Sequence, residues 1–325
     1  MPLHRHQIDS RVLVGNALGD SPIRDLHVWV PPGYDGRPLP ALLAVVGFTG
    51  TGAMLFNADP LAEDLGRKLE RLIAGGACPP CIVAAADCFT RVGGNQYMNS
   101  TATGRWEDHL LDEVIPFVDK TYPVTRWGVF GKSSGGYGSM VLGLRHPDVF
   151  AALADHSGDA GFEMCYLPDF PDALDAWRAA GGPAAWLDAF WADPNRRRKK
   201  HQRPLNALAM AAHYSPDPAS PHLGIDFPFD LDTGEFRPAV WERWREHDPV
   251  VMIPRRAAAA RRLRLVYIDC GRQDEWALIW GARTKAKKLR AAGVEPVFEE
   301  FDDGHLNITY RYDASLPRLV RALVD

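Results

Sequence analysis

Short apolar runs recur along the chain and alternate with stretches in which apolar residues return every three or four positions. The runs have the length of strands and are bounded by glycine, proline and polar residues, which is typical of strands buried in a parallel sheet. The amphipathic stretches between them are typical of helices that pack on such a sheet. Strands are expected at residues 25–30, 41–48, 81–87, 126–131, 150–157, 263–271 and 296–301.

The clearest helix is expected over residues 106–120, because its apolar positions follow the spacing of one helix face. That stripe consists of Leu110, Leu111, Val114, Phe117 and Val118. Further helices are expected at residues 58–74, 135–145, 275–292 and 315–324. The alternation predicts an α/β fold with a mostly parallel central sheet and helices on both of its faces.

Residues 158–262 break the alternation. We expect them to form a mainly helical insertion, a cap or lid on a core made of residues 1–157 and 263–325. Five of the ten tryptophans lie in this segment; they suggest an aromatic-lined substrate pocket, although tryptophans in a cap more often form its own core. We interpret the basic run RRRKKHQR (196–203) as a solvated helix face rather than a dock for an acidic partner.

The composition is that of a globular protein of ordinary charge. Of the 325 residues, 46% are hydrophobic and 24% are charged, and the net charge of −4 gives no reason to expect binding to nucleic acid or to an anionic membrane. No apolar segment has the length of a signal peptide near the N-terminus or of a membrane span elsewhere. We therefore expect a soluble, cytoplasmic protein that acts on a small molecule and could form a homo-oligomer.

The cysteines and histidines predict neither a metal site nor a cofactor. Five cysteines cannot all pair with one another, and reduced thiols are expected. Cys78 and Cys81 form a C-x-x-C directly before an apolar run, and no second pair completes a zinc site. His4 and His6 have no further ligand residues at metal spacing.

The stretch WGVFGKSSGG (127–136) allows two incompatible interpretations. A phosphate-binding loop needs glycine five positions before its Gly-Lys-Ser, but that position is Arg126. A nucleophile elbow needs a strand, small residues two before and two after a serine, and then a helix. Gly131 and Gly135 flank Ser133 at that spacing, so the sequence favours the elbow.

Ser133 is favoured over Ser134 as the nucleophile, because Ser134 would place the long side chain of Lys132 where a small residue is needed. The backbone N–H of Ser134 would then point at a developing oxyanion from the start of a helix. A second donor should come from the loop GFTGTG (47–52), where the amide of Phe48 is the candidate and Thr49 its neighbour. A purely structural glycine-rich turn is the alternative there.

The acid and the base should follow the serine in the order Asp or Glu, then His, at the ends of later strands. Asp274 lies just past the expected strand 263–271, and we favour it over its neighbour Glu275 and over Asp269 inside the strand. His305 lies in the loop DDGHLN after the last expected strand. His109, His146 and His156 fit the required position less well. Trp276 is a candidate lining residue beside the acid.

Four blocks of the sequence resemble successive blocks of one α/β-hydrolase family. They are GRWEDHLLDEVIPFVDKTYPV, GKSSGGYGSMVLGLRHPDVFAALADHSG, IDCGRQDEW and DDGHLNITY. The family is that of the esterases related to esterase D type S-formylglutathione hydrolases, enterochelin esterases and mycolyltransferases. The resemblance covers roughly residues 40–159 and 263–325 and leaves out the insertion. It implies an α/β-hydrolase fold, a triad and two oxyanion amides, which fall on Ser133, Asp274, His305, Phe48 and Ser134.

The chain departs from the family that it resembles at the elbow and at the oxyanion loop. Lys132 and Ser134 stand where relatives often carry His or Gln and Met, and the loop resembles the SGLT loop of esterase D rather than an HGG start. We expect a serine esterase that forms an acyl-enzyme on a small to medium apolar or aromatic ester. An acyltransferase with the same triad, a siderophore lactone esterase and a non-catalytic hydrolase-like binding protein remain alternatives.

Overall fold

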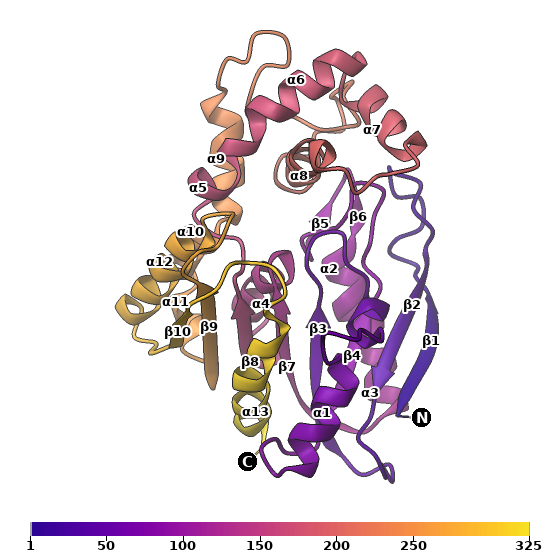
Figure 1. Cartoon of the computed structure of the whole chain (residues 1–325), viewed down its shortest axis with the longest axis vertical. Coiled ribbons are helices and arrows are strands. Elements are labelled where there is room, and N and C mark those ends of the chain that lie inside the picture. The colour runs from indigo at the N-terminus through magenta and orange to yellow at the C-terminus, as the bar shows by residue number, and fades with distance from the viewer. Residues whose placement is uncertain (1, 325) are drawn as a thin grey trace.

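A sheet of eight strands forms the centre of the molecule (Figure 1). The computed structural model describes residues 2–324. In spatial order the strands are β1 (Leu3–Asp9), β2 (Ile23–Trp29), β4 (Ile82–Ala86), β3 (Leu39–Val45), β7 (Val124–Lys132), β8 (Phe150–His156), β9 (Leu265–Gly271) and β10 (Val297–Phe301). From β4 to β10 all neighbours are parallel, whereas β2 runs antiparallel to both β1 and β4. The mostly parallel α/β sheet is confirmed, and all seven expected strands are present.

Helices cover both faces of this sheet. Those outside the insertion are α1 (Leu65–Ala74), α2 (Trp106–Asp108), α3 (Ile115–Thr121), α4 (Ser134–Arg145), α12 (Leu278–Ala291) and α13 (Tyr312–Leu323). A wider π-helical turn, His109–Val114, joins α2 to α3, so the expected helix over 106–120 is continuous. Single 3₁₀ turns lie at Gly52–Phe56, Leu167–Asp169 and Ile308–Arg311. A two-residue hairpin, β5 (Asn99–Ser100) and β6 (Gly104–Arg105), stands apart from the main sheet.

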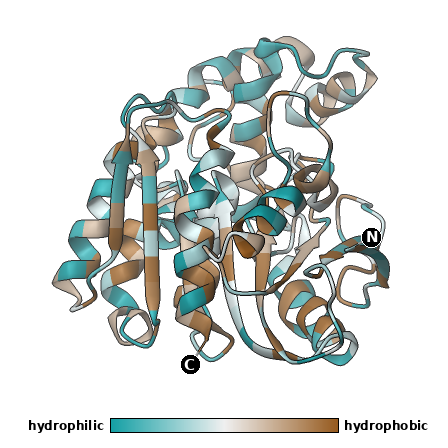
Figure 2. Cartoon of the chain, turned by 60° about the horizontal axis from the view of Figure 1, so that its bottom comes forward, coloured by the Kyte–Doolittle hydropathy of each residue, from teal (hydrophilic) through white to brown (hydrophobic). Residues whose placement is uncertain are grey.

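Alternate residues of the central strands pack on opposite sides of the sheet. On β3, Leu43 faces the layer that contains α2, α3, α4 and α12, whereas Leu42 faces α1 and α13. Both side chains are fully buried, and burial of a leucine of this kind contributes about 1.5–3 kcal/mol to folding. Figure 2 shows the brown of hydrophobic residues along the strands and teal on many outer helix faces. The two apolar layers hold the ends of the strands in register.

Seven helices lie between β8 and β9; most of them rise above one end of the sheet, whereas the last two lie beside it and contact α4 (Figure 1). They are α5 (Phe162–Cys165), α6 (Phe170–Ala180), α7 (Pro183–Ala192), α8 (Lys199–Tyr214), α9 (Pro238–His247), α10 (Pro249–Arg255) and α11 (Ala257–Ala260). Their apolar core is continuous with that of the sheet, because Tyr137 of α4 packs edge-on against Tyr214 of α8 with ring centroids 5.9 Å apart. None of the helices within residues 2–324 combines the length and the apolar character that crossing a bilayer requires.

The tryptophans of this helical segment mostly form its own core. Trp177, Trp186, Trp241 and Trp244 are buried and none of them lines the main cavity. Only Trp191, among the five, reaches the cavity wall. Of the five, only Trp191 therefore lines the cavity, and the other four form the packed core that was the alternative.

Candidate active site

Ser133 lies at the sharp turn between β7 and α4, in a backbone conformation that residues with side chains rarely adopt. Its φ is 62° and its ψ is −126°, a strained combination that persists only where the surrounding structure enforces it. The turn lifts the hydroxyl above the end of the sheet, where it lines a cavity. This is the geometry that the Gly-x-Ser-x-Gly pattern predicts.

The two glycines of the pattern are required by close backbone approach. A Cβ on Gly131 would lie 2.3 Å from the carbonyl oxygen of Val45, and a Cβ on Gly135 would lie 2.1 Å from the same oxygen. Atoms cannot come this close without displacing β3. The crowding explains why Ser133, and not Ser134, takes the exposed position at the turn.

His305 joins Ser133 to a carboxylate. With its proton on Nδ1, the imidazole donates to Asp274 Oδ2 at 2.7 Å, and its Nε2 accepts from Ser133 Oγ at 2.9 Å. The imidazole is only 4% exposed, and the ring of Trp276 packs against it with centroids 4.7 Å apart. The structure thus brings together the serine, histidine and aspartate that the sequence singled out.

Backbone groups fix the carboxylate of Asp274. Its Oδ1 accepts from the N–H of Trp276 at 3.0 Å and from the N–H of Leu278 at 3.3 Å. The turn after β9 therefore directs Oδ2 toward the imidazole. The expected alternatives do not occupy this position: Asp269 is buried inside β9, and Glu275 contacts the histidine loop instead.

Glu275 is a positioning residue that the sequence analysis did not recognise. Its Oε2 accepts from the backbone N–H of His305 at 2.7 Å. A Cβ on Gly304 would come within 2.8 Å of the same carboxylate, so the glycine lets this contact form. A contact between a carboxylate and a loop amide thirty positions later has no characteristic spacing, so the sequence does not reveal it.

Two backbone amides near Ser133 fit the expected oxyanion donors. Within residues 2–324 the N–H of Phe48 has no hydrogen-bond acceptor, whereas the N–H of its neighbour Thr49 donates to Gly93 O at 2.8 Å. Ser134 is the first residue of α4, so its N–H has no partner inside the helix. Phe48, Thr49 and Ser134 all line the cavity together with Ser133.

The cavity over Ser133 has a volume of about 890 Å³, a size that accommodates a drug-sized ligand. Core residues form its floor, and α7, α8 and the loop between them form much of its wall. The apolar side chains that line it include Phe48, Phe89, Phe190, Trp191, Leu205 and Trp276. Trp276 and Thr49 therefore lie where the sequence analysis placed candidate lining residues.

Part of the basic run also borders this cavity, which the sequence analysis did not anticipate. Arg196, Arg197, Arg198 and Lys199 are exposed, as expected of a solvated segment, but they lie on the cavity wall. A run of charged residues in a sequence predicts that the segment is exposed to solvent. It does not predict which way the segment faces, because that depends on how the loop between α7 and α8 folds back.

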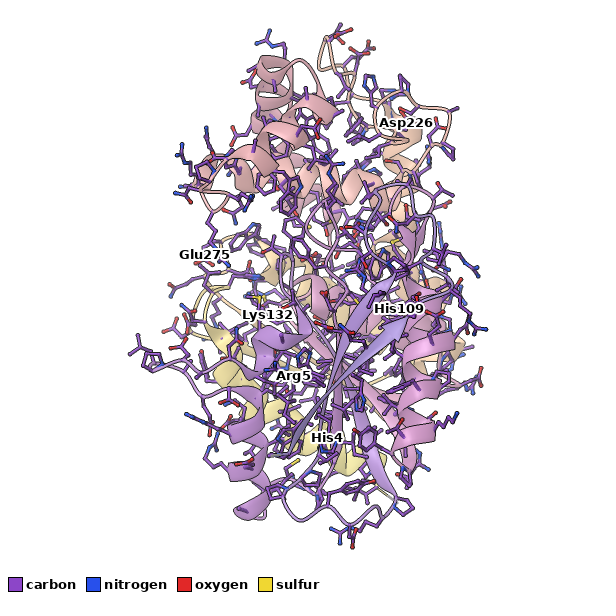
Figure 3. The ribbon with its side chains drawn as sticks, turned by 90° about the vertical axis from the view of Figure 1, so that its right-hand side faces the viewer. His4, Arg5, His109, Lys132, Asp226 and Glu275 are labelled. Atoms are coloured by element: carbon purple, nitrogen blue, oxygen red, sulfur yellow. The ribbon has the colours of Figure 1, made fainter. Side chains whose placement is uncertain are left out.

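Lys132 is the last residue of β7 and lines the cavity next to Ser133; Figure 3 labels it below the upper helices. Burial lowers the pKa of its ammonium to about 8, although Asp274, Asp159 and Glu275 favour the charged form. Asp159 lines the same cavity, and its Oδ2 accepts from Tyr166 Oη at 2.8 Å. A positive charge therefore stands beside Ser133 near neutral pH.

A second serine, histidine and aspartate chain occurs in the core. His156 Nδ1 is 2.7 Å from Asp269 Oδ1, and its Nε2 is 2.8 Å from Ser315 Oγ. All three residues are fully buried and none lines the cavity. A substrate cannot reach these three residues, and their hydrogen bonds join β8, β9 and α13. Accessibility therefore distinguishes this buried set of hydrogen bonds from the one at Ser133.

The five cysteines are free and buried, in line with the expected reduced thiols. In the C-x-x-C pair, Cys81 is fully buried beside Cys78, which gives no exposed redox site. No group of three or more His, Cys, Asp or Glu residues that could hold a metal ion is found within the described range 2–324.

A match to one known family shows the class of the protein. A family model described as "Putative esterase" matches residues 23–323, nearly the whole chain. The chain belongs to this family. It is thus an enzyme of the esterase class, and the resemblance noted in the sequence is confirmed.

Solved structures show the same α/β-hydrolase fold as this esterase. A ferulic acid esterase is 17% identical with a TM-score of 0.61, and the match covers 98% of each chain. An S-formylglutathione hydrolase from Agrobacterium tumefaciens is 14% identical with a TM-score of 0.60, covering 99% of this chain and 95% of the other. A fluorophosphonate-binding serine hydrolase from Staphylococcus aureus is 14% identical with a TM-score of 0.58, covering 99% and 98%. At these identities the likeness establishes the fold.

Proposed function

We propose that this esterase hydrolyses carboxylic esters through Ser133, His305 and Asp274 by way of an acyl-enzyme. The observation that carries the proposal is the unbroken hydrogen-bond chain from Asp274 Oδ2 through the imidazole to Ser133 Oγ at the floor of an open cavity. Each member has the environment that its role needs. Asp274 is held by backbone amides, His305 is shielded by Trp276, and Ser133 is exposed to substrate.

The first half of the reaction forms the acyl-enzyme. His305 Nε2 takes the proton of Ser133 as Oγ attacks the ester carbonyl, and Asp274 stabilises the imidazolium that results. The N–H groups of Phe48 and Ser134 donate to the oxyanion of the tetrahedral intermediate. The imidazolium then protonates the departing alkoxide, and the alcohol leaves.

The second half repeats these steps with water. His305 takes a proton from a water molecule that attacks the acyl carbonyl, and the proton passes to Ser133 as the acid leaves. If an alcohol replaces water at this stage, the same machinery transfers the acyl group. Product analysis with an added alcohol separates these outcomes, and a trilactone substrate tests the siderophore alternative.

Replacement of Ser133 tests the proposal. With p-nitrophenyl butyrate, Ser133→Ala should lower kcat by a factor on the order of 10⁶, because only binding and the oxyanion donors remain. Ser134→Ala is the matched control: it keeps the backbone N–H and removes only a hydroxyl that donates to Asp159 at 3.2 Å. Activity of Ser133→Ala near the parental rate would show that the nucleophile lies elsewhere.

The cytoplasmic location, the absence of nucleic-acid and membrane partners, and the possible homo-oligomer remain predictions from composition. The cavity supports the predicted small to medium ester, because its volume and aromatic wall suit such a ligand. The basic side chains that line the same cavity give further information on the chemical class of the substrate.

A further inference from the structure

The wall of the cavity carries an excess of positive charge. Five of its lining side chains are cationic and a single one, Asp159, is a carboxylate. The chain as a whole has a net charge of −4, so this excess does not follow from a generally basic surface. The cations, which we call the cationic wall, are Lys132, Arg196, Arg197, Arg198 and Lys199.

The contacts that hold the loop of Arg196, Arg197 and Arg198 in place do not pair these arginines with a carboxylate that lines the cavity. Arg196 donates from Nη2 to the carbonyl oxygen of Trp191 at 2.9 Å, and its guanidinium lies over the Trp191 ring, 5.2 Å from the centroid. Arg198 forms a long ion pair with Asp193, with Nε and Oδ2 3.7 Å apart. The first of these contacts directs the loop along the wall.

Three members of the cationic wall have no side-chain hydrogen bond or ion pair within residues 2–324. Arg197, Lys199 and Lys132 form neither an ion pair nor a hydrogen bond through their charged groups within this range. Lys132 is half-buried, and Asp274, Asp159 and Glu275 favour its charged form without fully offsetting the cost of burial, so the pKa of its ammonium stays lowered. A negatively charged group on a ligand would pair with Arg197 or Lys199 and would further favour the charged form of Lys132.

The one carboxylate on the wall is already occupied. Asp159 Oδ2 accepts from Tyr166 Oη at 2.8 Å, from Gln96 Nε2 at 3.2 Å and from Ser134 Oγ at 3.2 Å. These donors come from three different segments and are buried with it. Asp159 is therefore fixed in place, and as a single carboxylate it offsets only part of the charge of the five cations.

We propose that the substrate is an ester of medium size that carries a carboxylate. Its apolar or aromatic part packs on Phe48, Phe190 and Trp276, and its carboxylate binds the cationic wall, where guanidinium groups can form paired hydrogen bonds with both oxygens. This inference rests on the proposed function, because the ester carbonyl must reach Ser133. It adds the chemical class of the substrate.

Two matched pairs of esters test the charge preference. In the first pair, 4-carboxyphenyl butyrate is compared with 4-carbamoylphenyl butyrate, so the charge is on the alcohol. In the second, monophenyl adipate is compared with the phenyl ester of adipic acid monoamide, so the charge is on the acyl chain. At low ionic strength kcat/KM for the charged ester of at least one pair should exceed that of its neutral partner by about tenfold or more. Added salt should reduce this ratio.

Variants of the cationic wall locate the effect. The exposed double variant Arg197→Gln with Lys199→Gln should lower the charged-to-neutral ratio by about fivefold or more, mainly through KM of the charged ester. The control Lys200→Gln with Arg255→Gln removes the same charge from exposed residues that do not line the cavity, and it should leave the ratio unchanged. Loss of the ratio in both double variants would contradict specific binding.

Lys132→Met tests the deep end of the wall. In the parent the preference should weaken as pH rises through about 8, where Lys132 loses its proton while the arginines keep theirs. The carboxylates that face Lys132 are Asp274, Asp159 and Glu275. In Lys132→Met this step in the pH profile should disappear, and its persistence would exclude Lys132 from the binding site.

The outcomes separate this inference from the proposed function. Neutral esters that are hydrolysed as well as or better than charged ones, in both pairs, would overturn the inference and leave the esterase proposal standing. No hydrolysis of any of the four esters would remove both. A preference for the charged ester that depends on Arg197 and Lys199 would support both.

Discussion

At the scale of single residues, the site depends on a few contacts that orient His305. Asp274 holds Nδ1 of the imidazole, Trp276 packs on the ring, and Glu275 accepts from the backbone N–H. The first of these contacts was predictable from the order of acid and base along the chain. The third was not, because a carboxylate that binds a loop amide has no fixed spacing and no typical neighbour.

Removal of the Glu275 carboxylate should disturb the position of His305 rather than the binding of substrate. Glu275→Ala is expected to lower kcat about tenfold to a hundredfold with little change in KM, whereas Glu275→Gln, which keeps an acceptor, should recover much of the loss. The rate of labelling by a fluorophosphonate should fall in parallel. The control Glu295→Ala removes an exposed ion pair with Arg290 and should leave kcat as it is. A rise in KM alone would point to a role in binding instead.

At the scale of elements, strands that are apolar on both faces were predictable, whereas the largely exposed edge strand β1 was not. β3 and β4 are buried at every position, and such runs stand out in the sequence. β1 was missed because its residues are mostly exposed or half-buried, with only Ile8 buried, so no apolar run marks it. The helix expected over 58–74 begins only at Leu65, where the Asp64 side chain accepts from the N–H of Arg67.

The helix α8 contains a buried histidine that should make the protein sensitive to acid. Burial of His213 lowers its pKa to about 3, so the folded state keeps it neutral, whereas the unfolded state binds a proton below about 6.5. The stabilising contribution is therefore present above pH 6.5 and is lost as pH falls, by up to about 1.4 kcal/mol per pH unit. Urea unfolding at pH 7, 6 and 5 should show a smaller loss in His213→Met.

The control for this prediction is the exposed His222. His222→Met should keep the parental dependence of the unfolding free energy on pH, because that side chain is solvated in the folded state as well. The same slope in His213→Met and in the parent would show that other groups cause the acid sensitivity.

At the scale of the whole molecule, the helical segment and the sheet behave as parts of one core. Tyr214 and Trp244 of the segment pack in the same apolar cluster as Tyr137 of α4, and Ser100 donates to the carbonyl oxygen of Ala212 at 2.5 Å. The sequence predicted the position and helical content of this segment. It could not predict the continuity of the core or the direction of the basic loop, because both depend on contacts between distant positions.

A continuous core predicts a single unfolding transition. Tryptophan fluorescence, to which the five tryptophans of residues 158–262 contribute, should give the same urea midpoint as far-UV circular dichroism and as loss of esterase activity. Two separated midpoints, with fluorescence changing first, would show that the segment unfolds independently and acts as a separate cap.

The most direct test of the central claim is to map a covalent serine probe onto the chain. A fluorophosphonate reacts with a serine only where a base activates its hydroxyl and donors stabilise the phosphorus-bound oxyanion. The account predicts one adduct per chain, found by mass spectrometry of peptides on Ser133, and none in His305→Ala under the same conditions. An adduct on Ser134, or no adduct in the intact protein, would contradict it.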